Sequence, residues 1–139
     1  MVIVVDTSVF VAALLGPEGP SREVLRQCLA GKHQPLMGTA LFCEYEALLS
    51  REGLFRRCLL ARAEREDLLD AFLSVCRWTR IYYRWRPNIP DEGDNHIVEL
   101  AVAGSAEAIV TRNPRDFRTP ELWFPGLRVL GPEALIKEV

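Results

Sequence analysis

The sequence predicts an α/β fold, with a central, mostly parallel β-sheet of about five strands and helices on both faces. Short runs of β-forming residues alternate along the chain with segments of helical spacing, and this alternation favours parallel connections. The first run, Val2 to Val5, is wholly aliphatic, which is typical of a strand buried on both faces. A length of 139 residues with 49% hydrophobic residues suits one globular domain spanning 1–139.

Glycine and proline mark most of the predicted boundaries, since Gly16-Pro17 and Gly31 follow helical segments. The first half is predicted to contain a strand at 2–6, helices at 7–15 and 19–30, a strand at 35–38, and a helix at 39–50 capped by Thr39. The second half is predicted to contain helices at 54–61 and 63–77, a strand at 80–84, a helix at 91–103, strands at 107–111 and 127–130, and a helix from Pro132.

The net charge of −2 does not by itself indicate nucleic-acid binding, although segment 51–86 holds nine arginines against five acids. The four cysteines form no CxxC pair, so we expect reduced core cysteines in a cytoplasmic protein. The first residues lack the basic region of a signal peptide, and no apolar run reaches the roughly 18 residues of a membrane span. We therefore expect no membrane association.

Two acids in the first half are candidate site residues. Asp6 follows the first predicted strand, where open α/β sheets place their active sites, although it also suits the N-cap of the next helix. Glu44 has apolar neighbours on a predicted helix, where a carboxylate is costly unless it is paired or binds a metal. Glu46 has similar neighbours, and the spacing leaves open which of the two faces solvent.

Three acids in the second half are further candidates. Asp91 and Asp94 are three residues apart at a predicted helix start and so share a face, although this position also suits the helix dipole. Asp116 lies in the loop after the fourth predicted strand, where a site is again expected, although an Asx-type turn around Asn113-Pro114 also explains it.

All of these acids can meet at one edge of a parallel sheet. Clustered oxygen ligands without matching His or Cys suit hard cations such as Mg²⁺ or Mn²⁺. Such a site favours metal-assisted phosphodiester hydrolysis, in which the metal lowers the pKa of a bound water. Carboxylates that face one another without a metal repel, so we expect a raised pKa for some of them.

Four features together resemble PIN-domain proteins. They are a hydrophobic strand followed by Asp6-Thr7-Ser8, a Glu in the third helix, Asp91-x-x-Asp94 before an Ala-containing helix, and Thr111-x-Asn113-x-x-Asp116-Phe117. The set is similar to the VapC-like toxin components of bacterial toxin–antitoxin systems over about residues 2–130. The resemblance implies a Rossmann-like α/β/α sandwich, a Mg²⁺- or Mn²⁺-dependent endoribonuclease, a cognate antitoxin protein and a homodimer.

The resemblance also assigns roles to individual positions. The residues matched to catalysis and metal binding are Asp6, Glu44, Asp94 and Asp116, with Asp91 as an additional metal ligand. The residues expected to orient carboxylates or water are Thr7, Ser8, Thr111 and Asn113. Many relatives have Asp where Asn113 stands, so one-metal and two-metal operation both stay open. A non-catalytic PIN-like module that binds RNA or a protein is the alternative function.

Basic and aromatic residues suggest RNA contacts. Arg112 and Arg115 flank the expected site and are predicted to bind RNA phosphate. Residues 77–86 interleave four arginines with four aromatics, which suits single-stranded RNA or, alternatively, a strand packed through its aromatic rings. His33 and His96 have no ligand partners in the sequence and are interpreted as structural or surface residues. The surplus apolar residues that suit an interface are Trp78, Tyr82, Trp85, Trp123 and Phe124.

Overall fold

A five-stranded sheet forms the centre of the computed structural model, which describes residues 1–16, 18–81, 95–117 and 124–138. The strands are β1 (Val2–Val5), β2 (Gln34–Met37), β3 (Arg77–Trp78), β4 (Ala108–Val110) and β5 (Arg128–Leu130). All four strand pairings are parallel, and the spatial order is β3-β2-β1-β4-β5. The predicted fold class is therefore confirmed.

The order of the strands places a topological switch point next to β1. From β1 the chain continues to β2 and β3 on one side, whereas β4 and β5 lie on the other side. Val4 and Val5 pair with Ile109 and Val110 of β4, so the carboxyl ends of β1 and β4 lie side by side. In open parallel sheets this is where the loops separate and a ligand can enter.

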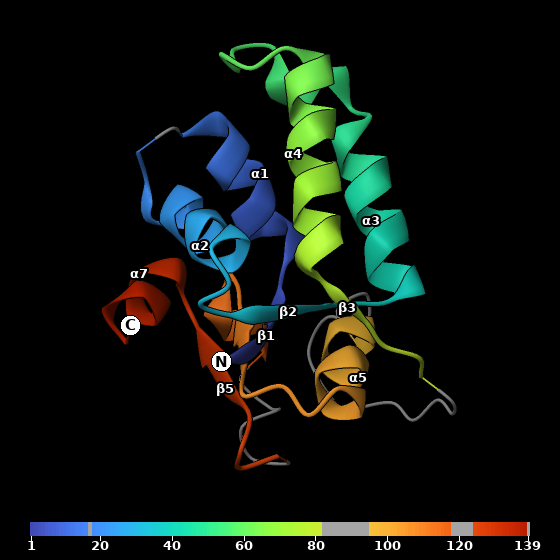
Figure 1. The fold of residues 1–139 in the computed structure, drawn as a ribbon, viewed down its shortest axis with the longest axis vertical. Coiled ribbons are helices and arrows are strands. Elements are labelled where there is room, and N and C mark those ends of the chain that lie inside the picture. The colour runs from blue at the N-terminus through green and yellow to red at the C-terminus, as the bar shows by residue number, and fades with distance from the viewer. Residues whose placement is uncertain (17, 82–94, 118–123, 139) are drawn as a thin grey trace.

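Helices cover both faces of the sheet. They are α1 (Thr7–Leu15), α2 (Pro20–Leu29), α3 (Thr39–Leu49), α4 (Arg62–Val75), α5 (Asn95–Ala103) and α7 (Pro132–Lys137), with 3₁₀ turns η1 (Glu52–Phe55) and η3 (Pro114–Phe117). Figure 1 shows α1 to α4 above β2 and α5 below it, where α5 packs on β1, β2 and β4. The central strands are accordingly buried on both sides, which explains their uninterrupted aliphatic sequence.

Three aromatic rings hold α1, α3 and α4 together. The ring of Phe10 lies 5.3 Å from Tyr45 and 5.4 Å from Phe72, measured between centroids, and all three side chains are buried. The hydroxyl of Tyr45 also donates a 2.7 Å hydrogen bond to the carbonyl oxygen of Val5. This bond ties α3 to the last residue of β1, directly before Asp6.

The third strand lies earlier than the sequence predicts. The prediction of a strand at 80–84 is wrong for residues 80 and 81, which are not in a strand, and 82–84 lie outside the described residues. Arg77 and Trp78 instead pair with Leu36 and Met37, because α4 ends at Val75 and the chain meets the edge of β2 at once. High β-propensity does not set the register of a short edge strand.

Several smaller predictions are also corrected. The helix expected at 54–61 is only the 3₁₀ turn η1, and α4 ends two residues before the predicted residue 77. The N-cap of α3 is Gly38 rather than Thr39, without a side-chain capping bond. Cys43 is exposed rather than part of the core, whereas Cys28 is buried. Within the described ranges, no helix is long and apolar enough to cross a membrane.

Candidate functional site

Asp6 lies at the switch point, immediately after β1. Its backbone N–H donates to the carbonyl oxygen of Val110, and its side chain is only 8% exposed. One carboxylate oxygen, Oδ2, accepts hydrogen bonds of 2.8 Å from Ser8 Oγ and of 2.8 Å from Thr111 Oγ1. Asp6 occupies the N-cap position of α1 but makes no side-chain capping bond. The carboxylate therefore accepts from side-chain hydroxyls of α1 and of the residue after β4 rather than from backbone amides of the helix.

Two hydroxyl groups fix the orientation of this carboxylate. Ser8 Oγ accepts a 3.2 Å hydrogen bond from the backbone N–H of Arg112, and Thr111 Oγ1 accepts one of 3.1 Å from the N–H of Asn113. Each hydroxyl thus accepts from a backbone amide and donates its proton to Asp6. The loop after β4 is in this way bonded to the acid that follows β1.

Glu44 is the second acid at this edge of the sheet. Its half-buried side chain leaves α3 toward β1, whereas Glu46 is exposed, which settles the choice that the helical spacing left open. Glu44 Oε1 accepts a 2.8 Å hydrogen bond from Thr7 Oγ1, and the same hydroxyl lies 3.5 Å from Asp6 Oδ1. Thr7 therefore lies between the two carboxylates and joins them.

His96 completes the contacts of Glu44. His96 lies on α5, and its Nε2 is 2.7 Å from Glu44 Oε2 on α3. This hydrogen bond is the main reason that the pKa of Glu44 lies below its ordinary value; burial acts in the opposite direction, and the Thr7 bond adds to the lowering. Glu44 is therefore not one of the acids with a raised pKa, because a histidine and a hydroxyl form hydrogen bonds with it. The Nδ1 atom of His96 is buried and has no hydrogen-bond partner among the residues that the structure describes.

Sequence reasoning did not assign His96 to the site. Its position two residues after Asp94, at the start of α5, was the available signal. A single histidine without a spaced ligand partner looks the same in the sequence whether it faces solvent or a carboxylate. The contact with Glu44 arises from the packing of α3 against α5, which spans 52 residues of the chain.

The remaining predicted residues are less closely connected. Asp116 is half-buried in η3, a 3₁₀ turn in which its N–H donates to the backbone carbonyl oxygen of Asn113. The side chains of Arg112 and Arg115 are exposed at the same edge. Asp91 and Asp94 lie outside the described residues, and so do Tyr82, Trp85 and Trp123. In the parts of the chain that are described, no group of three or more His, Cys, Asp or Glu residues is close enough to bind a metal ion.

The donor chemistry at the switch point fits a hard cation. Asp6 and Glu44 offer only oxygen atoms, and among the described residues Asp6 Oδ1 accepts only the long 3.5 Å contact from Thr7. Because each carboxylate oxygen has two lone pairs, both groups can coordinate a cation while keeping their hydrogen bonds. Oxygen donors of this kind suit Mg²⁺ or Mn²⁺ rather than soft metals.

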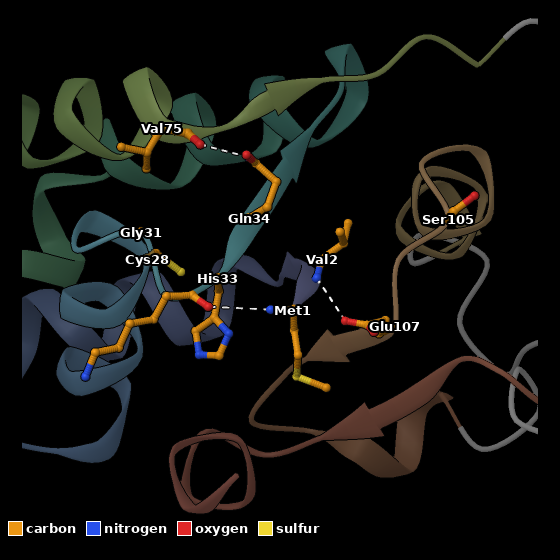
Figure 2. A pocket seen from close by; sticks show the side chains of 10 residues that line it. Met1, Val2, Cys28, Gly31, His33, Gln34, Val75, Ser105 and Glu107 are labelled. Carbon is orange, nitrogen blue, oxygen red and sulfur yellow. Dashed lines mark hydrogen bonds between the residues drawn. The ribbon is translucent and has the colours of Figure 1, made fainter. Parts of the chain in front are cut away.

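A separate cavity lies at the opposite, amino-terminal edge of the sheet. It has a volume of about 630 Å³, and Figure 2 shows Met1, Val2, His33, Gln34 and Glu107 around it. Its polar groups are largely used within the protein, since Glu107 accepts from the N–H of Val2 and Gln34 donates to the carbonyl oxygen of Val75 (Figure 2). It contains no pair of joined carboxylates, which distinguishes it from the switch-point site.

Comparison with known proteins agrees with this geometry. A family model described as a PIN domain matches residues 2–115. The crystal structure of VapBC2 from Rickettsia felis bound to a DNA fragment from their promoter is similar in fold, with a TM-score of 0.62, 18% sequence identity, and coverage of 94% of this chain and 98% of that chain. No curated protein sequence matches the chain significantly. The family match covers most of the chain, which therefore belongs to the PIN-domain family.

Proposed function

We propose that the whole chain, residues 1–139, is a single PIN-like nuclease domain that acts as a Mg²⁺- or Mn²⁺-dependent endoribonuclease. The observation that carries this proposal is the Asp6–Thr7–Glu44 arrangement, in which one hydroxyl lies between two carboxylates at the switch point. An aspartate needed only as a helix cap would accept a hydrogen bond from a backbone N–H in the first turn of α1, and the side chain of Asp6 makes no such capping bond.

The cation would be held by Asp6 and Glu44 together with Asp94 and Asp116, and Asp91 is an additional candidate ligand. When bound, it would supply an acidic water molecule and positive charge opposite the reacting phosphate. Membership of the PIN family and the oxygen-only donor set at Asp6 and Glu44 support this assignment. With Asn113 contributing a neutral oxygen at most, both one and two metal ions are compatible with the proposal.

The residues around the acids have positioning roles in this proposal. Ser8 and Thr111 hold Asp6 in one orientation, and Thr7 holds Glu44. His96 donates to Glu44 and keeps that carboxylate ionised, as the lowered pKa of Glu44 indicates. Arg112 and Arg115 are exposed beside the acids and would bind the phosphate of the RNA.

The proposed biological setting is a toxin–antitoxin system. The sequence resemblance to VapC-like toxins and the similarity in fold to VapBC2 support a cognate antitoxin as the protein partner. A homodimer and a cytoplasmic location follow from the same proposal. The exposed Trp78 and the half-buried Phe124 are the described members of the apolar set that would suit an interface.

The proposal is tested by RNA cleavage with metal-stripped protein. A labelled, unstructured RNA is incubated with the wild type, Asp6→Asn and Asp94→Asn, before and after Mg²⁺ or Mn²⁺ is added. Cleavage that needs the metal and disappears in both folded variants supports the nuclease. If the folded, metal-free wild type binds RNA but cleaves none of several RNAs after either metal is added, the non-catalytic binding module replaces the nuclease as the proposed function.

A further inference from the structure

A second surface feature adjoins the candidate site and takes no part in the contacts of its acids. It is a cleft of about 720 Å³ between α1, the start of α2, the loop after β4, and α7. Helix α7 packs beside α2 in the fold (Figure 1). We call this the α2–α7 cleft; its walls include Pro20, Ser21, Arg112, Pro132 and Lys137. Its size lies within the range of about 300–1,000 Å³ that is common for small-molecule sites.

One wall of the α2–α7 cleft is continuous with the candidate site. The backbone N–H of Arg112 donates to Ser8 Oγ, and that hydroxyl donates to Asp6. Arg112 therefore has its main chain bonded to the acidic site and contributes to the wall of the cleft. A chain-like ligand that reacts at Asp6 would reach this cleft with its neighbouring units.

The charges in the α2–α7 cleft favour an anionic ligand. Arg112 and Lys137 are exposed, and neither has an ion-pair partner within the described parts of the chain. Glu133 is the acid that lines the cleft, so the lining as a whole is positive, whereas the full chain has a net charge of −2. This surface therefore suits an anionic ligand although the full chain is slightly acidic.

The remaining walls suit the neutral body of such a ligand. Pro20, Pro114 and Pro132 line the cleft with apolar ring surface. Ser21 is only 6% exposed and also lines the cleft. Its hydroxyl is a group that can donate to or accept from a polar atom of a ligand.

We infer that the α2–α7 cleft binds a nucleotide of the RNA substrate adjacent to the bond that is cleaved. Arg112 contacts the phosphate nearest to Asp6, Lys137 contacts a phosphate further along the strand, and the sugar or base lies against the proline rings near Ser21. This inference rests on the proposed function, because it takes RNA as the ligand. An acidic protein segment would use the same charges but would have no reason to continue toward Asp6.

The sequence provides an internal control for testing this inference. The chain contains only two lysines, Lys137 in the α2–α7 cleft and Lys32 at the opposite edge of the sheet, and both are exposed. Metal-free wild-type protein is treated with an amine-reactive reagent, with and without a short unstructured RNA, and labelling of each lysine is measured by mass spectrometry. We expect RNA to protect Lys137 and to leave Lys32 unchanged.

A matched pair of variants gives a second readout. Lys137→Gln is expected to weaken RNA binding, measured by fluorescence anisotropy in chelator, roughly threefold to tenfold, and to reduce the salt slope by about 0.7. Lys32→Gln is expected to bind like the wild type. Both changes are on exposed side chains, so folding is expected to be unaffected, which circular dichroism checks.

The outcomes separate this inference from the proposed function. If RNA is cleaved while Lys137 stays unprotected and Lys137→Gln binds normally, the cleft inference is overturned and the nuclease stands. If Lys137 is protected but no RNA is cleaved in either metal, RNA binding by the cleft is supported, whereas the nuclease and the position of the nucleotide beside a cleaved bond are overturned. If polyglutamate protects Lys137 and RNA does not, the cleft binds a protein segment and the inference is overturned.

Discussion

Thr7 donates its hydroxyl proton to Glu44 over 2.8 Å, although the two residues are 37 positions apart in the sequence. Thr7 is the first residue of α1 and directly follows Asp6, so this bond fixes the distance between the two acids. The contact joins the start of α1 to α3, and the same hydroxyl lies beside both Asp6 and Glu44. The proposed activity therefore depends on a hydroxyl that carries no charge.

Replacing Thr7 by valine is expected to lower RNA cleavage roughly tenfold to a hundredfold, because groups that orient metal-binding carboxylates typically contribute that much. Thr7→Ser keeps the donor and should retain most of the activity. Initial rates at saturating metal provide the measurement, and urea unfolding confirms that both variants are folded. Equal rates for valine and serine would show that the hydroxyl has no positioning role.

Removing the hydroxyl of Tyr45 tests the bond between α3 and β1. In Tyr45→Phe, the buried carbonyl oxygen of Val5 loses its 2.7 Å donor, and the expected loss of unfolding free energy is about 1–3 kcal/mol. Ser74→Ala is the control, since it removes an exposed hydrogen bond within α4 and should change stability by less than about 0.5 kcal/mol. Urea denaturation measures both; equal stabilities would contradict the role assigned to Tyr45.

Gly104 tests the packing of α5 against β2. A Cβ atom at this position would overlap the side chain of Leu36, which is fully buried. Gly104→Ala is therefore expected to destabilise the protein by about 1–3 kcal/mol, as overpacked cores do. Gly53→Ala is the control, since nothing lies near its Cβ position. If urea denaturation gives the two variants the same stability, α5 does not pack on β2 in the way described.

The cysteines should differ sharply in reactivity. Burial raises the pKa of the Cys28 and Cys76 thiols to about 12, so at pH 8 only about 10⁻⁴ of each is thiolate, the reactive form. Cys43 is exposed and should react first with a thiol reagent, whereas all four react in urea. Raising the pH toward 12 should speed the reaction of Cys28 and Cys76 with the reagent, because a larger fraction of each becomes thiolate. In the Cys43→Ser variant at pH 8, we expect rapid labelling at Cys58 alone. Rapid labelling of Cys28 would contradict its burial.

The sequence predicted the parts of the fold that depend on local pattern. The predicted strand at β1 and the predicted boundaries of α1 agree with the structure. Both rest on signals in the local sequence, namely the uninterrupted aliphatic run and the Gly-Pro pair that ends the helix. The position of β3 could not be predicted, since it depends on which residues meet the edge of β2 after α4 ends. Aromatic β-formers at 80–84 indicated a strand but could not fix its register.

The candidate site was predictable only in part, for a similar reason. Strand ends pointed to Asp6 and Asp116 as candidates, because parallel strands bring their carboxyl ends to one edge, whereas Thr111 was named only through the family resemblance. The choice between Glu44 and Glu46 needed the orientation of α3, which is set by the buried aromatic contacts of Tyr45. The contact of His96 with Glu44 needed the packing of α5, which no periodicity in the sequence reports.

The most direct test of a metal site at Asp6 and Glu44 is calorimetric titration of the metal-stripped protein with Mn²⁺. Glu44→Gln and Glu46→Gln are a matched pair, because both lie on α3 and differ in that Glu46 is exposed. We expect the wild type and Glu46→Gln to bind the metal, and Glu44→Gln and Asp6→Asn to bind it at least tenfold more weakly. If Glu44→Gln binds Mn²⁺ as tightly as Glu46→Gln, the assignment of the metal site is wrong.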